Sequence, residues 1–119
     1  MTGRERAAAL ASALDAKLAE NINILRIEKL TTLADYFIIC TGTSSTHVNT
    51  LKEACEMRLD AEGIAPHHVE GYGGGSWVLM DYESVIVHIF TDEARHFYQL
   101  DKLWSDAEVI SPEDMIEQK

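Results

Sequence analysis

The sequence predicts one α/β domain in which a mixed β-sheet of about five strands is covered by helices. Residues 35–62 read as a strand, a tight turn and a helix, which is the first half of an α/β unit. Residues 77–82 and 85–90 alternate as two strands of a hairpin. A chain of 119 residues that is 46% hydrophobic can build one core and leaves little room for a second domain.

The first predicted element is a helix over residues 4–20. Apolar side chains recur there at spacings of three or four, which draws one buried stripe. The stripe consists of Ala7, Leu10, Leu14 and Leu18. Residues 22–28 are β-like, but their alternation slips between Ile24 and Leu25, which indicates a bulge or a late start of the strand.

A strand over residues 35–41 follows, and its near-continuous apolar run is typical of a strand covered on both faces. Gly42 ends it, and the hydroxyl residues at 43–45 can cap the next helix, which reaches about Glu62. Gly63 suits the position just after that helix. The buried face of the helix is predicted to hold Val48, Leu51, Cys55 and Leu59.

The second half begins with a short strand at 66–70 and a flexible glycine-rich loop at 71–76. After the hairpin, Thr91 is expected to cap a last helix. Asp92 and Glu93 in the first turn of that helix suit the helix dipole. We expect its buried side to hold Phe97, Leu100, Leu103 and Trp104. The domain is predicted to span residues 1–107, and residues 108–119 to form an acidic, mobile tail.

Composition limits the classes of partner. The chain has 20 acidic and 10 basic residues, a net charge of −10, so the phosphate backbone of nucleic acid is repelled and a basic partner is favoured. Ten of the acidic residues, against three basic ones, lie from Asp81 onward. No apolar run approaches the ~18 residues that a membrane span needs. Two separated cysteines indicate a reducing compartment, and we expect the cytoplasm of a bacterium-like cell.

The turn Gly42–Ser45 resembles a phosphate-binding turn, because it lies between a strand and the N-terminus of a helix, which attracts anions. A P-loop would have a lysine after its last glycine, and a nucleotidyltransferase would have a D-x-D carboxylate pair for Mg²⁺. This chain has neither: His47, Val48 and Asn49 follow the turn. Residues 71–76 also fall short of G-x-G-x-x-G. The favoured interpretation of the turn is a helix cap, and no cofactor is predicted.

The remaining reactive residues do not form a catalytic or metal-binding pattern. Cys40 and Cys55 fall at apolar positions, where a cysteine is usually a small core residue. His67 and His68 are adjacent in a strand and point to opposite sides, which prevents shared chelation. His88 is either a hydrogen-bonded core residue or a contact residue. The sequence therefore predicts a protein that is not an enzyme.

The first hairpin strand is apolar on both faces. Trp77, Leu79 and Asp81 share one face, whereas Val78, Met80 and Tyr82 share the other. One face could cover the core while the other meets a partner, since tryptophan and tyrosine are favoured interface anchors. The alternative is a strand that helices bury on both faces.

Four motifs, in order between about residue 7 and residue 107, resemble the Iojap-like ribosomal silencing factor family. They are A-D-Y-F-I-I-C-T-G-T-S-S-T-H-V (34–48), E-G-Y-G-G-G-S-W-V-L-M-D-Y (70–82), V-I-V-H-I-F (85–90) and R-H-F-Y-Q-L-D-K-L-W (95–104). The resemblance implies a nucleotidyltransferase-like fold without the catalytic carboxylates. It also implies binding to the large ribosomal subunit through its fourteenth protein, which blocks association with the small subunit and represses translation under nutrient limitation. A role in large-subunit assembly is implied as well.

With this resemblance, we expect the hairpin to bind the ribosomal protein. Trp77 and Leu79 would be apolar anchors, and Asp81 and Asp92 would face lysine or arginine. The full set of expected partner-binding residues is Trp77, Leu79, Asp81, Tyr82, His88 and Asp92. No direct, specific nucleic-acid binding and no membrane contact are expected. Two alternatives remain: a nucleotide-binding enzyme that uses the Gly42–Ser45 turn, and a homodimer that buries the Trp77 face.

Overall fold

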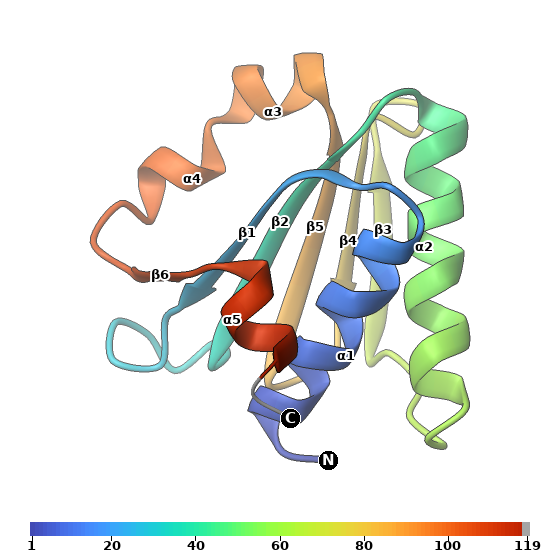
Figure 1. Cartoon of the computed structure of the whole chain (residues 1–119). Helices are drawn as coiled ribbons and strands as arrows, with labels where there is room; N and C mark the ends of the chain where they lie inside the picture. Colours follow the sequence, from blue (N-terminus) through green and yellow to red (C-terminus); the bar gives the residue numbers. More distant parts are fainter. Residues whose placement is uncertain (118–119) are drawn as a thin grey trace.

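Six strands form one mixed sheet in the computed structural model, in which residues 1–117 are described (Figure 1). The strands are β1 (Glu20–Arg26), β2 (Tyr36–Gly42), β3 (His68–Tyr72), β4 (Trp77–Asp81), β5 (Val85–Thr91) and β6 (Glu108–Ile110). Their order across the sheet is β3-β4-β5-β2-β1-β6. β2 and β5 pair in parallel, and the other neighbours pair antiparallel. The predicted mixed α/β sheet is confirmed, with six strands in place of about five.

Helices cover the two faces unequally. The helices are α1 (Gly3–Ala16), α2 (Ser45–Asp60), α3 (Asp92–Tyr98), α4 (Leu100–Leu103) and α5 (Pro112–Glu117). Figure 1 shows α1, α2 and α5 together in front of the sheet. The larger core lies beneath them and includes Leu10, Leu14 and Met80. A smaller core on the other face includes Phe37 and Phe90, with Trp104 against it. Within residues 1–117, every helix is too short or too polar to cross a membrane.

β2 lies between the two cores, and all seven of its residues are buried. Tyr36, Ile38 and Cys40 face the larger core, whereas Phe37 and Ile39 face the smaller one. This alternation of two apolar faces explains the near-continuous apolar run, and it confirms the prediction of a strand covered on both faces.

The first helix is shorter than predicted, and one residue of its stripe is not buried. α1 ends at Ala16, and Leu18 has φ 65° and is 79% exposed. The chain must reverse there to enter β1 at Glu20, and the left-handed residue makes that reversal. His47 Nε2 lies 2.8 Å from the carbonyl oxygen of Lys17, which holds the reversal against α2.

Two predictions about helix and strand ends are confirmed. The hydroxyl of Ser44 accepts a hydrogen bond from the His47 N–H (3.1 Å) and caps α2, and Gly63 follows its C-terminus at φ 73°. β1 is irregular as expected, although its register shift against β2 lies earlier, between Glu20 and Asn23.

The last predicted helix is broken in two, which changes its buried side. Gln99 has φ 49° and ψ 45°, a left-handed conformation that separates α3 from α4. Leu100 and Trp104 pack on the smaller core as predicted. Phe97 and Leu103 do not, and are 79% and 74% exposed. A break rotates the second segment, so a single stripe cannot continue across it.

The C-terminal segment was expected to be a mobile tail, but its described part, up to residue 117, packs on the domain. β6 pairs antiparallel with β1, and α5 contacts α1. Met115 is fully buried in the larger core, and Ile110 and Ile116 pack against the same core. These few apolar residues are enough to dock an otherwise acidic segment. Residues 118 and 119 lie outside the described residues.

Candidate protein-binding face of the sheet

Half of the sheet has little helical cover on the face opposite α1 and α2. Along β4, Val78 and Met80 are buried in the larger core, whereas Trp77, Leu79 and Asp81 are only partly buried. Three cross-strand rows make up the face that we call the open sheet face. The rows are Tyr72–Trp77–Phe90, Glu70–Leu79–His88 and His68–Asp81–Ile86. The structure thus brings four of the expected partner-binding residues, Trp77, Leu79, Asp81 and His88, to one face of the sheet.

Trp77 lies at the centre of an aromatic cluster. Its ring centroid is 4.6 Å from that of Tyr98, 4.7 Å from that of Tyr72 and 5.0 Å from that of Phe90. Tyr72 and Tyr98 remain 38% and 46% exposed, and Phe97 beside Tyr98 is 79% exposed. Aromatic side chains gathered at a surface are characteristic of protein interfaces, because they supply large apolar area with few rotatable bonds.

Sequence reasoning missed Tyr72 and Tyr98 as members of this cluster. The sequence predicts Tyr72 in the glycine-rich loop, but in the structure it ends β3 and lies directly opposite Trp77. The alternation of Val69 and Gly71 is too weak a signal to extend that strand. Tyr98 joins the cluster from α3, which is distant in sequence, so only the tertiary structure could place it there.

His88 is a buried residue that contacts Trp77 from within the protein. The indole Nε1 of Trp77 donates a hydrogen bond to His88 Nδ1 at 3.3 Å, so the ring proton of neutral His88 is on Nε2. Burial lowers the pKa of His88 to about 4, against a smaller opposing effect of Asp101. His88 is only 5% exposed, and its Nε2 has no hydrogen-bond partner among the described residues. It therefore orients Trp77 rather than offering its own polar atoms at the surface.

Tyr82 does not belong to the open sheet face, and this corrects its assignment as a partner-binding residue. It follows the alternation of Val78 and Met80, and its side chain is fully buried in the larger core. Its carbonyl oxygen accepts a hydrogen bond from Arg6 Nη1 at 2.7 Å, and burial raises the pKa of its phenol. A partner cannot reach this side chain without unfolding the core.

Carboxylates lie at the margin of the aromatic cluster. Glu70 lies in the same row as Leu79, Asp81 lies in the neighbouring row, and Asp92 is exposed in the first turn of α3. The N–H of Thr91 donates to the carbonyl oxygen of Ser76 at 2.9 Å, which places the start of α3 beside the start of β4. The open sheet face therefore combines apolar rings with acidic groups, which complements a surface that carries lysine or arginine.

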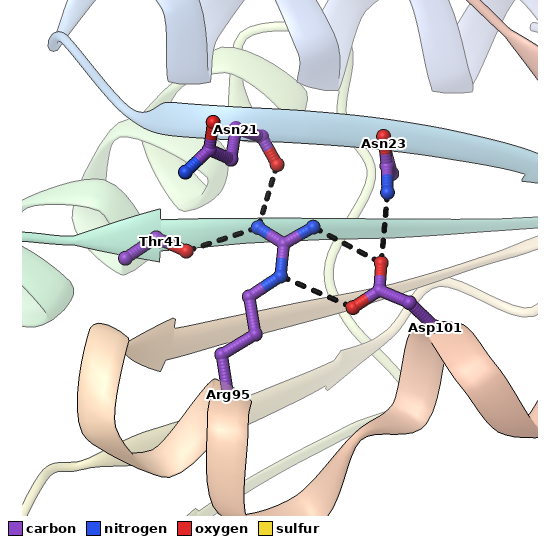
Figure 2. A network of polar contacts seen from close by, with 5 residues as sticks. All are labelled: Asn21, Asn23, Thr41, Arg95 and Asp101. Atoms are coloured by element: carbon purple, nitrogen blue, oxygen red, sulfur yellow. Dashed lines mark hydrogen bonds and ion pairs between the residues drawn. The ribbon is translucent and has the colours of Figure 1, made fainter.

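A polar network holds α3 and α4 against the sheet beside this face (Figure 2). Arg95 Nη1 donates to the carbonyl oxygen of Asn21 (2.6 Å) and to Thr41 Oγ1 (2.9 Å). Its Nε and Nη2 donate to Asp101 at 3.1 and 3.0 Å, and Asn23 donates to the same carboxylate at 2.8 Å. Partial burial opposes the charge of Asp101, but these hydrogen bonds and the guanidinium outweigh it and lower its pKa.

The Gly42–Ser45 turn uses its polar groups within the protein. The N–H of Thr43 donates to His47 Nδ1 at 2.8 Å, and the hydroxyl of Ser44 caps α2. A Cβ on Gly42 would lie 2.9 Å from Val48 Cγ2, so close packing explains the glycine. These contacts favour the capping interpretation of the turn. Among residues 1–117, no three His, Cys, Asp or Glu side chains gather as metal ligands.

Comparison with known proteins agrees with this architecture. Residues 1–119 match the family RsfS, described as ribosomal silencing factor during starvation. The ribosomal silencing factor of Bacillus subtilis is 40% identical over 97 residues, which cover 82% of each chain. That of Halalkalibacterium halodurans is 34% identical over 98% of this chain and 99% of its own.

A more distant relative and a solved structure extend the comparison. The mouse protein named mitochondrial assembly of ribosomal large subunit protein 1 is 27% identical over 81% of this chain and 43% of its own length. A crystal structure of a Chromobacterium violaceum protein superimposes with a TM-score of 0.84 at 30% identity, covering 88% of both chains. The match over the whole sequence and the shared fold show that this chain belongs to the RsfS family of ribosomal silencing factors.

Proposed function

We propose that this protein binds the large ribosomal subunit in the cytoplasm, through that subunit's fourteenth protein, and sterically blocks association with the small subunit. Translation would thereby be repressed when nutrients are limiting. Family membership supports a role at the ribosome. The observation that carries the proposal for the binding surface is the aromatic cluster around Trp77, which the helices leave partly exposed. Occlusion of this kind requires no bond making, in keeping with a regulatory protein rather than an enzyme.

The chemistry of the face suggests how a basic protein would be recognised. Trp77 and Leu79 would enter an apolar patch, with Tyr72 and Tyr98 widening the contact. Asp81 and Asp92 would meet lysine or arginine at its margin. The net charge of −10 would steer a basic partner toward the protein before the apolar contacts form.

The first test is sedimentation of the purified protein with isolated large subunits, isolated small subunits and joined ribosomes. We expect co-migration with large subunits alone, and a decrease in joined ribosomes when small subunits are added. Absence from every ribosomal fraction would contradict the proposal.

The second test locates the binding face with matched variants. Trp77→Ala should weaken binding by about 30- to 1,000-fold, the effect of losing a central aromatic anchor worth ~2–4 kcal/mol. Leu79→Ala should also weaken it, whereas Met57→Ala, which removes a 74% exposed side chain from α2 on the other face of the sheet, should not. Equal binding by all three variants, with circular dichroism showing that they fold, would place the interface elsewhere.

The third test concerns the acidic margin. Asp81→Asn should lower the association rate and weaken its dependence on salt, because one steering charge is lost. Asp60→Asn removes an equally negative, exposed charge at the end of α2 and serves as the control. An association rate of the unmodified protein that does not depend on salt would contradict the role of these carboxylates.

A second candidate function is large-subunit assembly, which the name of the mouse relative favours. Both functions begin with the same binding step, so subunit profiles of depleted cells separate them. Accumulated large-subunit precursors would support assembly, whereas excess joined ribosomes during starvation would support silencing.

The homodimer remains an alternative use of the open sheet face. A mass that falls on dilution, and a dimer that competes with large subunits, would support it. A nucleotide-binding enzyme is the weaker alternative, because the N–H of Thr43 and the hydroxyl of Ser44 are already paired within the protein. Saturable binding of a magnesium nucleoside triphosphate would revive it.

A further inference from the structure

We propose that Arg95 is a positioning residue for the open sheet face: it holds α3 and α4 to the sheet and thereby keeps Tyr98 against Trp77. This inference rests on the proposed function, since it assigns to Arg95 a part in forming the ribosome-binding surface. Arg95 is not expected to touch the partner, because its side chain is only 13% exposed.

One guanidinium joins α3 to three other elements, and two of them, β1 and β2, are distant in sequence. It donates to the backbone of β1 at Asn21, to the side chain of Thr41 in β2, and twice to Asp101 in α4 (Figure 2). Asn23 in β1 holds the same carboxylate at 2.8 Å. The network therefore fastens α3 and α4 to the sheet in addition to their apolar contacts, in which Ala94 is buried and Leu100 and Trp104 pack on the smaller core.

The network also spans the break between the helices. Arg95 lies before Gln99, and Asp101 lies after it. Gln99 has a left-handed backbone conformation, which residues other than glycine rarely adopt. The ion pair favours the broken arrangement over one continuous helix. Tyr98 directly precedes the break, so the direction of its ring depends on the same arrangement.

Within residues 1–117, Tyr98 is the one residue of α3 whose ring contacts Trp77. Its centroid lies 4.6 Å from that of Trp77 and 6.1 Å from that of Phe90. If α3 shifts on the sheet, this ring leaves the cluster and the apolar surface presented to a partner changes shape. Arg95 thus acts on binding through Tyr98.

Lysine cannot replace arginine in this position. A guanidinium offers five donors in a planar fork that matches a carboxylate on one edge and can bond other acceptors on the remaining edge. An ammonium is a compact charge and cannot pair bidentately with Asp101 while it also reaches Asn21 and Thr41. Arg95→Lys therefore keeps the charge and removes the bridge.

The first experiment is a double-mutant cycle on the affinity for isolated large subunits. It compares the unmodified protein with Arg95→Lys, Tyr98→Ala and the double variant. We expect Arg95→Lys to weaken binding by about two- to tenfold, the range that one aromatic pair accounts for, and to have almost no effect when Tyr98 is already alanine. Arg58→Lys is the matched control, because Arg58 lies in α2 on the other face of the sheet and pairs with Glu62 at 3.2 Å.

The second experiment reads the position of Tyr98 without any ribosome. Nuclear Overhauser contacts between the rings of Tyr98 and Trp77 should be present in the unmodified protein and in Arg58→Lys, and lost in Arg95→Lys. Asp101→Asn provides the same test if Arg95→Lys does not fold, because it removes the charge of the pair while keeping the side-chain size. Retained ring contacts in the folded variants would overturn the inference.

The two experiments separate failure of this inference from failure of the proposed function. If the unmodified protein does not bind large subunits, the proposed function fails and the ring contacts still decide the role of Arg95. If it binds and the losses of the two single variants multiply in the double variant, Arg95 acts independently of Tyr98 and the inference is wrong.

Discussion

Acidification should destabilise this protein through His88, because the folded chain holds that imidazole neutral. Burial lowers the pKa of His88 from 6.5 to about 4, whereas the unfolded chain returns it to its ordinary value. Between these two pH values the unfolded chain binds a proton that the folded chain does not. The contribution of His88 is therefore fully present above pH ~6.5 and is lost as the pH falls toward about 4.

The size of the effect follows from the two pKa values. The difference between 6.5 and about 4 corresponds to on the order of 3 kcal/mol of unfolding free energy. Urea unfolding at several pH values from about 7 to about 4.5 measures it. His88→Phe is the comparison, because phenylalanine suits the surrounding rings of Phe37 and Phe90 and does not titrate.

The test compares how the free energy of unfolding changes with pH in the two proteins, rather than its value at one pH. His88→Phe removes the acceptor of the Trp77 indole, so it has its own cost of about 1 kcal/mol at every pH. Other titrating groups act equally in both proteins and cancel in the difference. Equal slopes in the two proteins would refute the reasoning, as would a His88 imidazole that titrates near pH ~6.5 by nuclear magnetic resonance.

Three further predictions concern stability, each read by urea unfolding. Tyr82→Phe should leave the protein as stable or up to about 1 kcal/mol more stable, because the phenol hydroxyl is buried and has no hydrogen-bond partner within residues 1–117; a large loss would reveal a hidden hydrogen bond. Met115→Ala should cost about 2–5 kcal/mol, since that side chain is fully buried; a loss near zero would mean that α5 does not dock in solution. Ser44→Ala should cost about 1 kcal/mol and Ser44→Gly less, because only the cap of α2 is lost; equal effects of the two changes would argue against capping.

Much of the fold was predictable because its signals are local. The apolar run of β2 and the cap at Ser44 each depend on residues within a few positions along the chain. The docking of the C-terminal segment does not follow from local signals. Charged residues predominate in this segment, so its local sequence resembles a solvent-exposed tail. Its docking depends on Met115 and Ile110, which pack on a core formed by other parts of the chain.

The sequence by itself determined that Trp77, Leu79 and Asp81 share one face of a strand, because side chains alternate in any extended chain. Only the tertiary structure decided which of the two apolar faces stays open. α1 and α2 cover the side of Val78, Met80 and Tyr82.

Tertiary structure alone also brought Tyr98 to Trp77. That contact depends on the break at Gln99 and on the hydrogen bond from Arg95 to Asn21, 74 residues apart in the chain. Local patterns report the preferences of neighbouring residues. The choice between two apolar faces, and the completion of a surface by a distant helix, depend on long-range packing that no local pattern encodes.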